Sequence, residues 1–121
     1  MRNLAITAAL VAATVAIPAH AANLTGEYVI EGSCPAPNSA YRGTLSIQSQ
    51  PNGLFHTLTW RVGSDTVVGR GMETEGRMAI EFRFANGVSG LMEVRRDGAH
   101  WRGTWATYGS DQLCTEVWTS R

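Results

Sequence analysis

The segment RMAIEFRFANGVSGLMEVRRDGAHWRGTW, residues 77–105, decides the fold. Apolar and charged side chains alternate along it, which is typical of β-strands with one buried face. Asn86-Gly87 and Asp97-Gly98 interrupt the alternation, and Asn-Gly and Asp-Gly are the strongest short-range signals of a β-hairpin. The segment therefore predicts three consecutive antiparallel strands joined by tight turns.

The same pattern extends in both directions from this segment. Between residues 24 and 120 no stretch sustains the apolar i, i+3, i+4, i+7 spacing of a helix, and thirteen glycines divide the region into short pieces. We predict an all-β chain. Its strands are expected near 24–31, 41–50, 54–62, 66–73, 77–84, 88–96, 99–108 and 112–119.

Short connections between these strands predict an up-and-down meander. With no helix to cover it, a meander of eight strands most simply closes on itself, because closure removes the exposed edges. The first and last strands are then antiparallel neighbours, which places the two cysteines, Cys34 and Cys114, side by side at one rim. We therefore predict an eight-stranded antiparallel up-and-down barrel closed by one Cys34–Cys114 disulfide.

The first 21 residues have the pattern of a secretory signal peptide. Arg2 supplies a positive start, residues 4–17 are mostly apolar, and Ala19-His20-Ala21 fits a cleavage site. The apolar run is shorter than the roughly 20 residues that span a bilayer. We expect a signal peptide at 1–21, a single domain at 22–121, and a periplasmic or secreted protein, in a compartment that oxidises cysteines.

The charge balance excludes several classes of partner and chemistry. After residue 21 there are nine Arg, ten Asp and Glu and no Lys, so the basic excess typical of nucleic-acid binding is missing and lysine chemistry is excluded. One face of the predicted strands is charged, whereas a membrane barrel is apolar outside. That face carries Arg77, Glu81, Arg83, Glu93, Arg95, Arg102 and Thr104. We expect neither a nucleic-acid partner nor membrane insertion.

Hairpin register assigns the inward side chains. With loops at Ala85-Asn86-Gly87 and Asp97-Gly98, Gly90 lies opposite Phe82 and Trp105, and Glu93 lies opposite Arg102 on the outer face. The predicted interior is Tyr28, Ile30, Leu45, Ile47, Leu58, Trp60, Ile80, Phe82, Met92, Val94, Trp101 and Trp105.

Two placements stay open at this point. Glu116 and Trp118 point inward if the two cysteines are directly opposed. A three-residue loop at 74–76 turns Val68, Arg70 and Met72 inward, and a two-residue loop turns Gly69 and Gly71 inward instead. If Arg70 and Glu116 both point inward they should form an ion pair, because an isolated buried charge costs several kcal/mol.

Few residues offer catalytic chemistry. His56 shares its face with Leu58 and Trp60 and is expected to be a packing residue, while His100 falls on the charged outer face. Nucleophile-elbow, zinc-protease, dinucleotide and P-loop motifs are missing. We expect no enzymatic activity, no catalytic residue, no metal site and no cofactor.

The tryptophans give the main functional hypothesis. Inward-facing indoles could line a pocket for a flat or apolar ligand, although small barrels also use large side chains simply to fill their centre. The candidate ligand-binding residues are Tyr28, Trp60, Arg70, Trp101, Trp105 and Trp118.

The Pro-rich loop at residues 32–40 gives a second hypothesis. Anchored at Cys34, it could present a fixed surface to another protein. We thus expect an exported binding protein for a small apolar or aromatic ligand or an extracellular protein. The alternative is an inhibitor of an extracytoplasmic hydrolase acting through residues 32–40.

Two sets of short motifs resemble known proteins. Leu24-Thr25-Gly26-Glu27-Tyr28, Trp101-Arg102-Gly103-Thr104-Trp105 and Cys114-Thr115-Glu116-Val117-Trp118 resemble the first and last strands of the avidin family. The resemblance implies an avidin-like or lipocalin-like barrel of the calycin type. It does not extend to a biotin site, because Ile30, Leu45 and Ile47 stand where that family has polar groups. Tyr41-x-Gly43, Gly69-x-Gly71 and Glu116-x-Trp118 also resemble small exported bacterial proteins, some of which are labelled fibronectin-binding.

Overall fold

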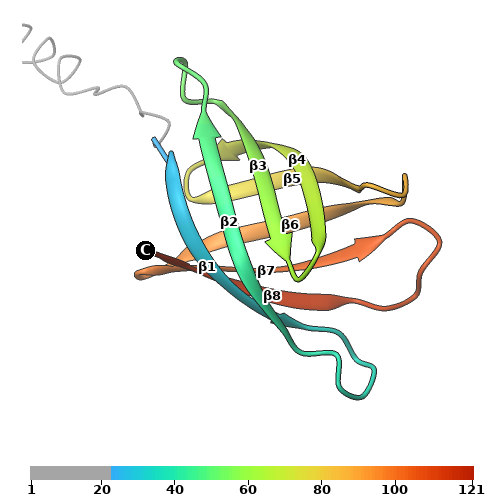
Figure 1. The fold of residues 1–121 in the computed structure, drawn as a ribbon. Coiled ribbons are helices and arrows are strands. Elements are labelled where there is room, and N and C mark those ends of the chain that lie inside the picture. Colours follow the sequence, from blue (N-terminus) through green and yellow to red (C-terminus); the bar gives the residue numbers. More distant parts are fainter. Residues whose placement is uncertain (1–22) are drawn as a thin grey trace, which may run out of the picture.

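Eight antiparallel strands follow one another around a closed barrel in the computed structural model, which describes residues 23–121 (Figure 1). Each strand pairs with the next, and the last pairs with the first. The strands are β1 (Gly26–Ser33), β2 (Tyr41–Ser49), β3 (Phe55–Val62), β4 (Asp65–Thr74), β5 (Arg77–Phe84), β6 (Ser89–Asp97), β7 (His100–Thr107) and β8 (Cys114–Ser120). The predicted fold class is confirmed.

Residues 1–21, assigned to a signal peptide from the sequence, lie outside the described residues. Across residues 23–121 no helix has the length and apolar character needed to cross a membrane.

The disulfide lies where β1 and β8 close the barrel. Cys34 and Cys114 form the predicted disulfide, and their Cα atoms are 4.2 Å apart. Ser33 pairs with Thr115, so the two cysteines are directly opposed. The same register settles the first open placement, because it turns Glu116 and Trp118 into the barrel, where both are buried. A disulfide in a small barrel is compatible with an oxidising, extracytoplasmic location.

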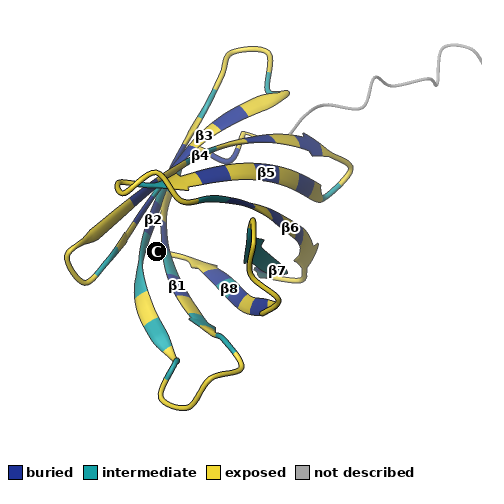
Figure 2. Ribbon diagram, turned by 90° about the vertical axis from the view of Figure 1, so that its right-hand side faces the viewer, coloured by how far each residue is buried: buried dark blue, intermediate teal, exposed yellow. Residues whose placement is uncertain are grey.

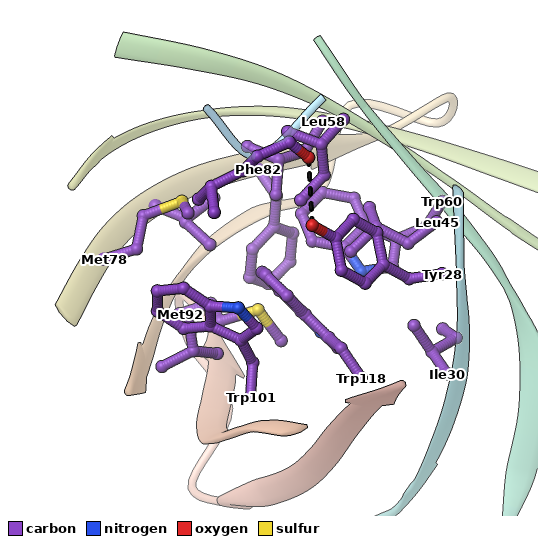
Figure 3. Close-up of a cluster of buried hydrophobic side chains, with 14 of the residues drawn as sticks. Tyr28, Ile30, Leu45, Leu58, Trp60, Met78, Phe82, Met92, Trp101 and Trp118 are labelled. Carbon is purple, nitrogen blue, oxygen red and sulfur yellow. Dashed lines mark hydrogen bonds between the residues drawn. The ribbon is translucent and has the colours of Figure 1, made fainter. Parts of the chain in front are cut away.

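Burial alternates along the strands, which gives the banded colouring of Figure 2. All the predicted interior residues are buried except Trp105, which is partly exposed. Figure 3 shows the buried aromatic rings of Tyr28, Trp60, Phe82, Trp101 and Trp118 gathered with aliphatic side chains in the centre of the barrel. Val67 and Met78 belong to the same core and were not predicted.

The predicted register between β6 and β7 is wrong by two residues. Asp97 pairs with His100, so the turn is Gly98-Ala99, with Gly98 at a φ of 63°. Glycine at the first central position is the requirement of a type II′ turn. A shift of two residues leaves every side chain on its predicted face, since strand side chains alternate with a period of two.

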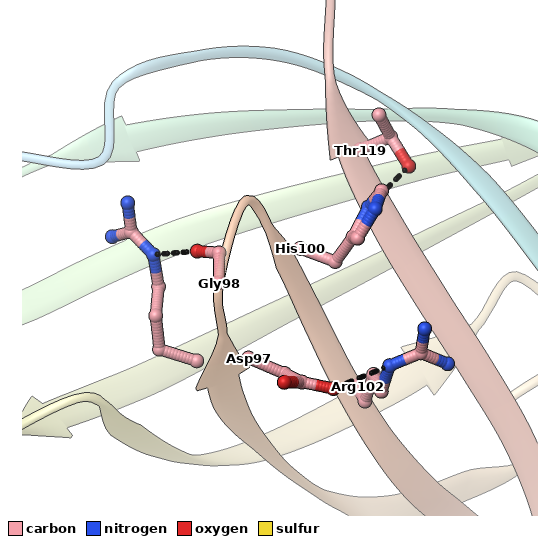
Figure 4. A network of polar contacts seen from close by, with 6 residues as sticks. Asp97, Gly98, His100, Arg102 and Thr119 are labelled. Atoms are coloured by element: carbon pink, nitrogen blue, oxygen red, sulfur yellow. Dashed lines mark hydrogen bonds and ion pairs between the residues drawn. The ribbon is translucent and has the colours of Figure 1, made fainter.

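This shift removes the predicted pairing of Glu93 with Arg102. Glu93 instead lies opposite Thr104. The Arg102 guanidinium forms an ion pair with Asp97, with 2.7 Å between Nε and Oδ2 (Figure 4).

The facing of β4 is now settled. Thr74 pairs with Arg77, which leaves a two-residue loop, Glu75-Gly76, with both residues at positive φ, as a type I′ turn requires. Gly69 and Gly71 therefore face inward. A Cβ at Gly69 would lie 2.9 Å from the Trp60 ring, so the glycine leaves the room that the indole occupies.

The alternative facing of β4 is wrong, because Val68, Arg70 and Met72 are exposed on the outer surface. Arg70 is therefore not a residue of the interior, and the proposed buried Arg70–Glu116 ion pair does not form.

Removing the disulfide should destabilise the barrel strongly. The bond spans 80 residues, and closing a loop of that length in the unfolded chain is worth about 4–5 kcal/mol in the chain-entropy model. We expect a Cys34→Ala/Cys114→Ala variant to lose about that much free energy of unfolding in urea titrations. Wild-type protein under reducing conditions should match the variant. A loss below about 1 kcal/mol would contradict this expectation.

Candidate functional site

The two ends of the barrel interior are built differently. At the end where β1 begins, Tyr28 and Leu24 are buried, and the Tyr28 hydroxyl donates to the Leu24 carbonyl oxygen over 2.9 Å. The Leu24 amide in turn donates to Ser49 Oγ over 2.9 Å. Trp101 is buried at the same end, so side chains fill this end.

The other end, which carries the disulfide, holds a cavity of about 220 Å³. Its walls come from the ends of β3 and β5 and from neighbouring positions on the other strands. Several wall residues are partly exposed, among them Phe84 and Trp105, so the cavity opens at this rim. The lining residues are Tyr41, Trp60, Val62, Val67, Phe82, Phe84, Met92, Trp105 and Glu116.

Aromatic rings packed edge to face form much of the wall. The ring centroids of Phe82 and Trp105 are 5.7 Å apart with an interplanar angle of 85°, and Phe84 packs against Phe82 at 6.0 Å. Trp60 contacts Phe82 on the opposite side at 6.4 Å. Such arrangements are favourable for aromatic pairs, so the rings hold one another in place around the cavity.

The carboxyl group of Glu116 is the centre of a hydrogen-bond network that joins three tryptophans and a tyrosine. Glu116 Oε2 accepts hydrogen bonds from the indole nitrogens of Trp60 at 2.9 Å and Trp118 at 2.8 Å. The Tyr41 hydroxyl donates to Glu116 Oε1 and accepts a bond from Trp105 Nε1 at 2.8 Å. Glu116 is only 4% exposed, so this acid connects four aromatic side chains within an apolar interior.

Burial controls the protonation of this cluster. It raises the pKa of Glu116 above its ordinary value, and the hydrogen bonds from Tyr41, Trp118 and Trp60 oppose that shift. Burial, followed by the nearby Glu116, also raises the pKa of the Tyr41 hydroxyl, which therefore stays protonated and donates. Among residues 23–121 the ion pairs are Arg42–Glu31 and Arg102–Asp97, so no cation in this part of the chain forms an ion pair with Glu116.

The predicted ligand-binding residues fall into four groups. Trp60 and Trp105 line the cavity. Trp118 is not part of the lining but donates a hydrogen bond to Glu116, which is. Tyr28 and Trp101 pack in the filled part of the barrel, away from the cavity, and Arg70 is outside.

Sequence reasoning missed Tyr41 and the two Phe residues, Phe82 and Phe84, as parts of a site. The signal for Tyr41 was present, because it shares its face with Leu45 and Ile47 on β2. For Phe84 the signal was its position at the end of β5, beside a turn and on the inward face.

The histidines lie away from the cavity. His56 is buried, as predicted; its Nδ1 is 2.8 Å from Ser49 Oγ, and its Nε2 has no hydrogen-bond partner. Burial lowers the pKa of His56, an effect that Glu73 opposes. His100 contacts Thr119 Oγ1 at 3.0 Å on the outer face (Figure 4). Over the described range, no group of three or more His, Cys, Asp or Glu residues is placed to hold a metal ion.

The predicted inhibitory loop at residues 32–40 is largely exposed. Pro35, Pro37 and Asn38 project into solvent. The loop is fixed at its base by the disulfide and by a hydrogen bond of 3.1 Å from the Cys34 amide to Ser39 Oγ.

No protein-family model matches the chain, and no curated protein matches it at a significant level.

The buried carboxyl should give the barrel a measurable pH dependence. The pKa of Glu116 is higher in the folded barrel than its ordinary value of 4.5. The protonated side chain therefore contributes fully to the free energy of unfolding below about pH 4.5, and this contribution is lost as the pH rises through the pKa of the folded state. Glu116→Gln removes this titration. We expect the unfolding free energy of the wild type, minus that of the variant, to fall from about pH 4 to about pH 8 in urea titrations.

The variant also provides the control, since His56 titrates in both proteins and cancels in the difference. A difference that is constant across the pH range would show that Glu116 has an ordinary pKa in the folded barrel.

Proposed function

We propose that this is an exported, non-enzymatic binding protein that holds a small apolar or aromatic ligand in the cavity at the disulfide end. The supporting observation is the open cavity with aromatic walls, in a barrel small enough for side chains to have filled it completely. Trp60 and Trp105, two of the residues expected to contact a ligand, lie in its wall.

The volume indicates how large a group the cavity can enclose. About 220 Å³ exceeds the roughly 150 Å³ cavity that accommodates benzene, and it is below the roughly 300 Å³ at which drug-sized pockets begin. The cavity therefore suits a molecule with one or two rings. Its walls are held by ring packing and by the Glu116 hydrogen bonds, so binding requires little ordering of side chains.

A periplasmic or secreted location fits this function. It is supported by the disulfide, which persists in oxidising compartments, and by the signal-peptide pattern of the first 21 residues.

The alternative, inhibition of an extracytoplasmic hydrolase, is favoured by one observation. Residues 35–38 are exposed and the loop that carries them is clamped at its base, so it could enter a cleft with little loss of entropy. The two functions differ in the surface they use, since the first requires the cavity and the second only the loop.

A matched pair of substitutions tests the cavity. Val67 lies in its wall, whereas the next residue, Val68, is 50% exposed on the outer face. We expect phenethyl alcohol and other neutral one- and two-ring compounds to change the tryptophan fluorescence saturably. Val67→Phe, whose ring would occupy the cavity, should weaken binding about ten-fold or more, and Val68→Phe should not.

Circular dichroism would confirm that both variants fold. The proposal is wrong if no one- or two-ring compound, neutral or charged, binds the wild type, or if Val67→Phe binds such a compound equally well.

A further inference from the structure

The acid at the cavity has no partner of opposite charge. Glu116 is 4% exposed, and its three hydrogen-bond donors, Tyr41, Trp60 and Trp118, are all neutral. Within residues 23–121 it forms no ion pair. Burying a carboxylate in an apolar site without a cation is costly, and neutral donors offset only part of that cost.

The carboxyl group also retains hydrogen-bonding capacity. An ionised carboxylate offers about four acceptor positions. Two indole nitrogens occupy Oε2, and Tyr41 occupies one position on Oε1. One position on Oε1 is therefore left for a donor, and Glu116 is itself part of the cavity lining.

The rest of the lining favours positive charge. The rings of Tyr41, Trp60, Phe82, Phe84 and Trp105 line the cavity together with Glu116, and the lining contains no Arg or His. Aromatic faces attract cations that approach within about 6 Å of the ring centroid. An anion would meet a carboxyl group and no compensating cation, and a neutral hydrocarbon would leave the free position on Oε1 unused.

From this juxtaposition we propose that the ligand is a small organic cation, an amine carrying one or two rings, whose ammonium group pairs with Glu116 while its apolar body packs against the aromatic wall. This inference rests on the proposed function and specifies its ligand class. Recognition combines a charge-assisted hydrogen bond with cation–π attraction.

A purely structural role for Glu116 makes a different prediction. A glutamine could orient the same rings, because its carbonyl oxygen can accept from both indoles and its amide nitrogen can donate to Tyr41. The negative charge is therefore dispensable for holding the rings but required for pairing with an ammonium group.

The test measures, by calorimetry, the affinity of the protein with its disulfide intact for three ligands of similar size. These ligands are phenethylamine, phenethyl alcohol and phenylpropionate. The variants are Glu116→Gln and Glu93→Gln; the second removes one negative charge from an exposed position on the outer face. We expect wild type and Glu93→Gln to bind the amine about ten-fold or more tightly than the alcohol, and the anion least. Glu116→Gln should lose that preference and bind the amine and the alcohol with about equal affinity.

A second measurement applies even if Glu116→Gln does not fold. In the wild type, amine affinity should fall as the pH is lowered from about 7 to about 4.5, because protons compete for Glu116, while affinity for the alcohol stays constant.

The outcomes separate the two proposals. Equal affinity for amine and alcohol in the wild type, an unchanged amine affinity in Glu116→Gln, or a pH-independent amine affinity would overturn the cation and leave the cavity as a neutral binding site. If none of the three ligands binds the wild type, the proposed function fails together with this inference.

Discussion

The pairing of β1 with β8 is the constraint on which the rest of the structure depends. Without that pairing the sheet would be an open meander with two free edges, and it would lack the contact that brings together two cysteines 80 residues apart in the sequence. Once they pair, the register that opposes Cys34 to Cys114 also turns Glu116 and Trp118 inward. The covalent bond and the polar centre of the cavity thus follow from a single alignment of two strands.

The polar centre explains why this barrel is not filled. Four aromatic side chains are connected through Glu116 and Tyr41, and these hydrogen bonds restrain the rings from moving into the remaining volume. The glycines on the inner face of β4 have the opposite effect, since they give space to neighbouring rings, as Gly69 does to Trp60. The cavity is what remains between rings fixed in this way.

Much of the fold could be predicted from the sequence because strand alternation and turn residues are local signals. The interior was identified despite the wrong turn at Asp97-Gly98, since a shift of two residues preserves every facing. β4 could not be resolved, because Gly69 and Gly71 carry no side chain to show which face is buried. The two possible loop lengths at residues 74–76 therefore left both facings open, and the structure leaves Val68 and Met72 exposed.

The cavity was harder to predict for a different reason. Whether an inward tryptophan fills or lines a space depends on its height along the barrel axis, and that height combines the stagger of all eight strands. Trp101 and Trp105 lie on one face of β7, yet one is packed in the core and the other borders the cavity. The role of Glu116 needed the same knowledge, because its partners lie on β2 and β3 as well as on β8.

Closure also limits how a macromolecule could attach to this surface. From Gly26 to Ser120 each strand is bonded to a neighbour on both sides, so its amide and carbonyl groups are committed to the sheet. A peptide cannot extend the sheet by adding a strand, which is a common way for β-domains to capture extended segments of low sequence specificity. A protein partner would therefore contact side chains on the outer face of the strands, or the loops at the two ends of the barrel.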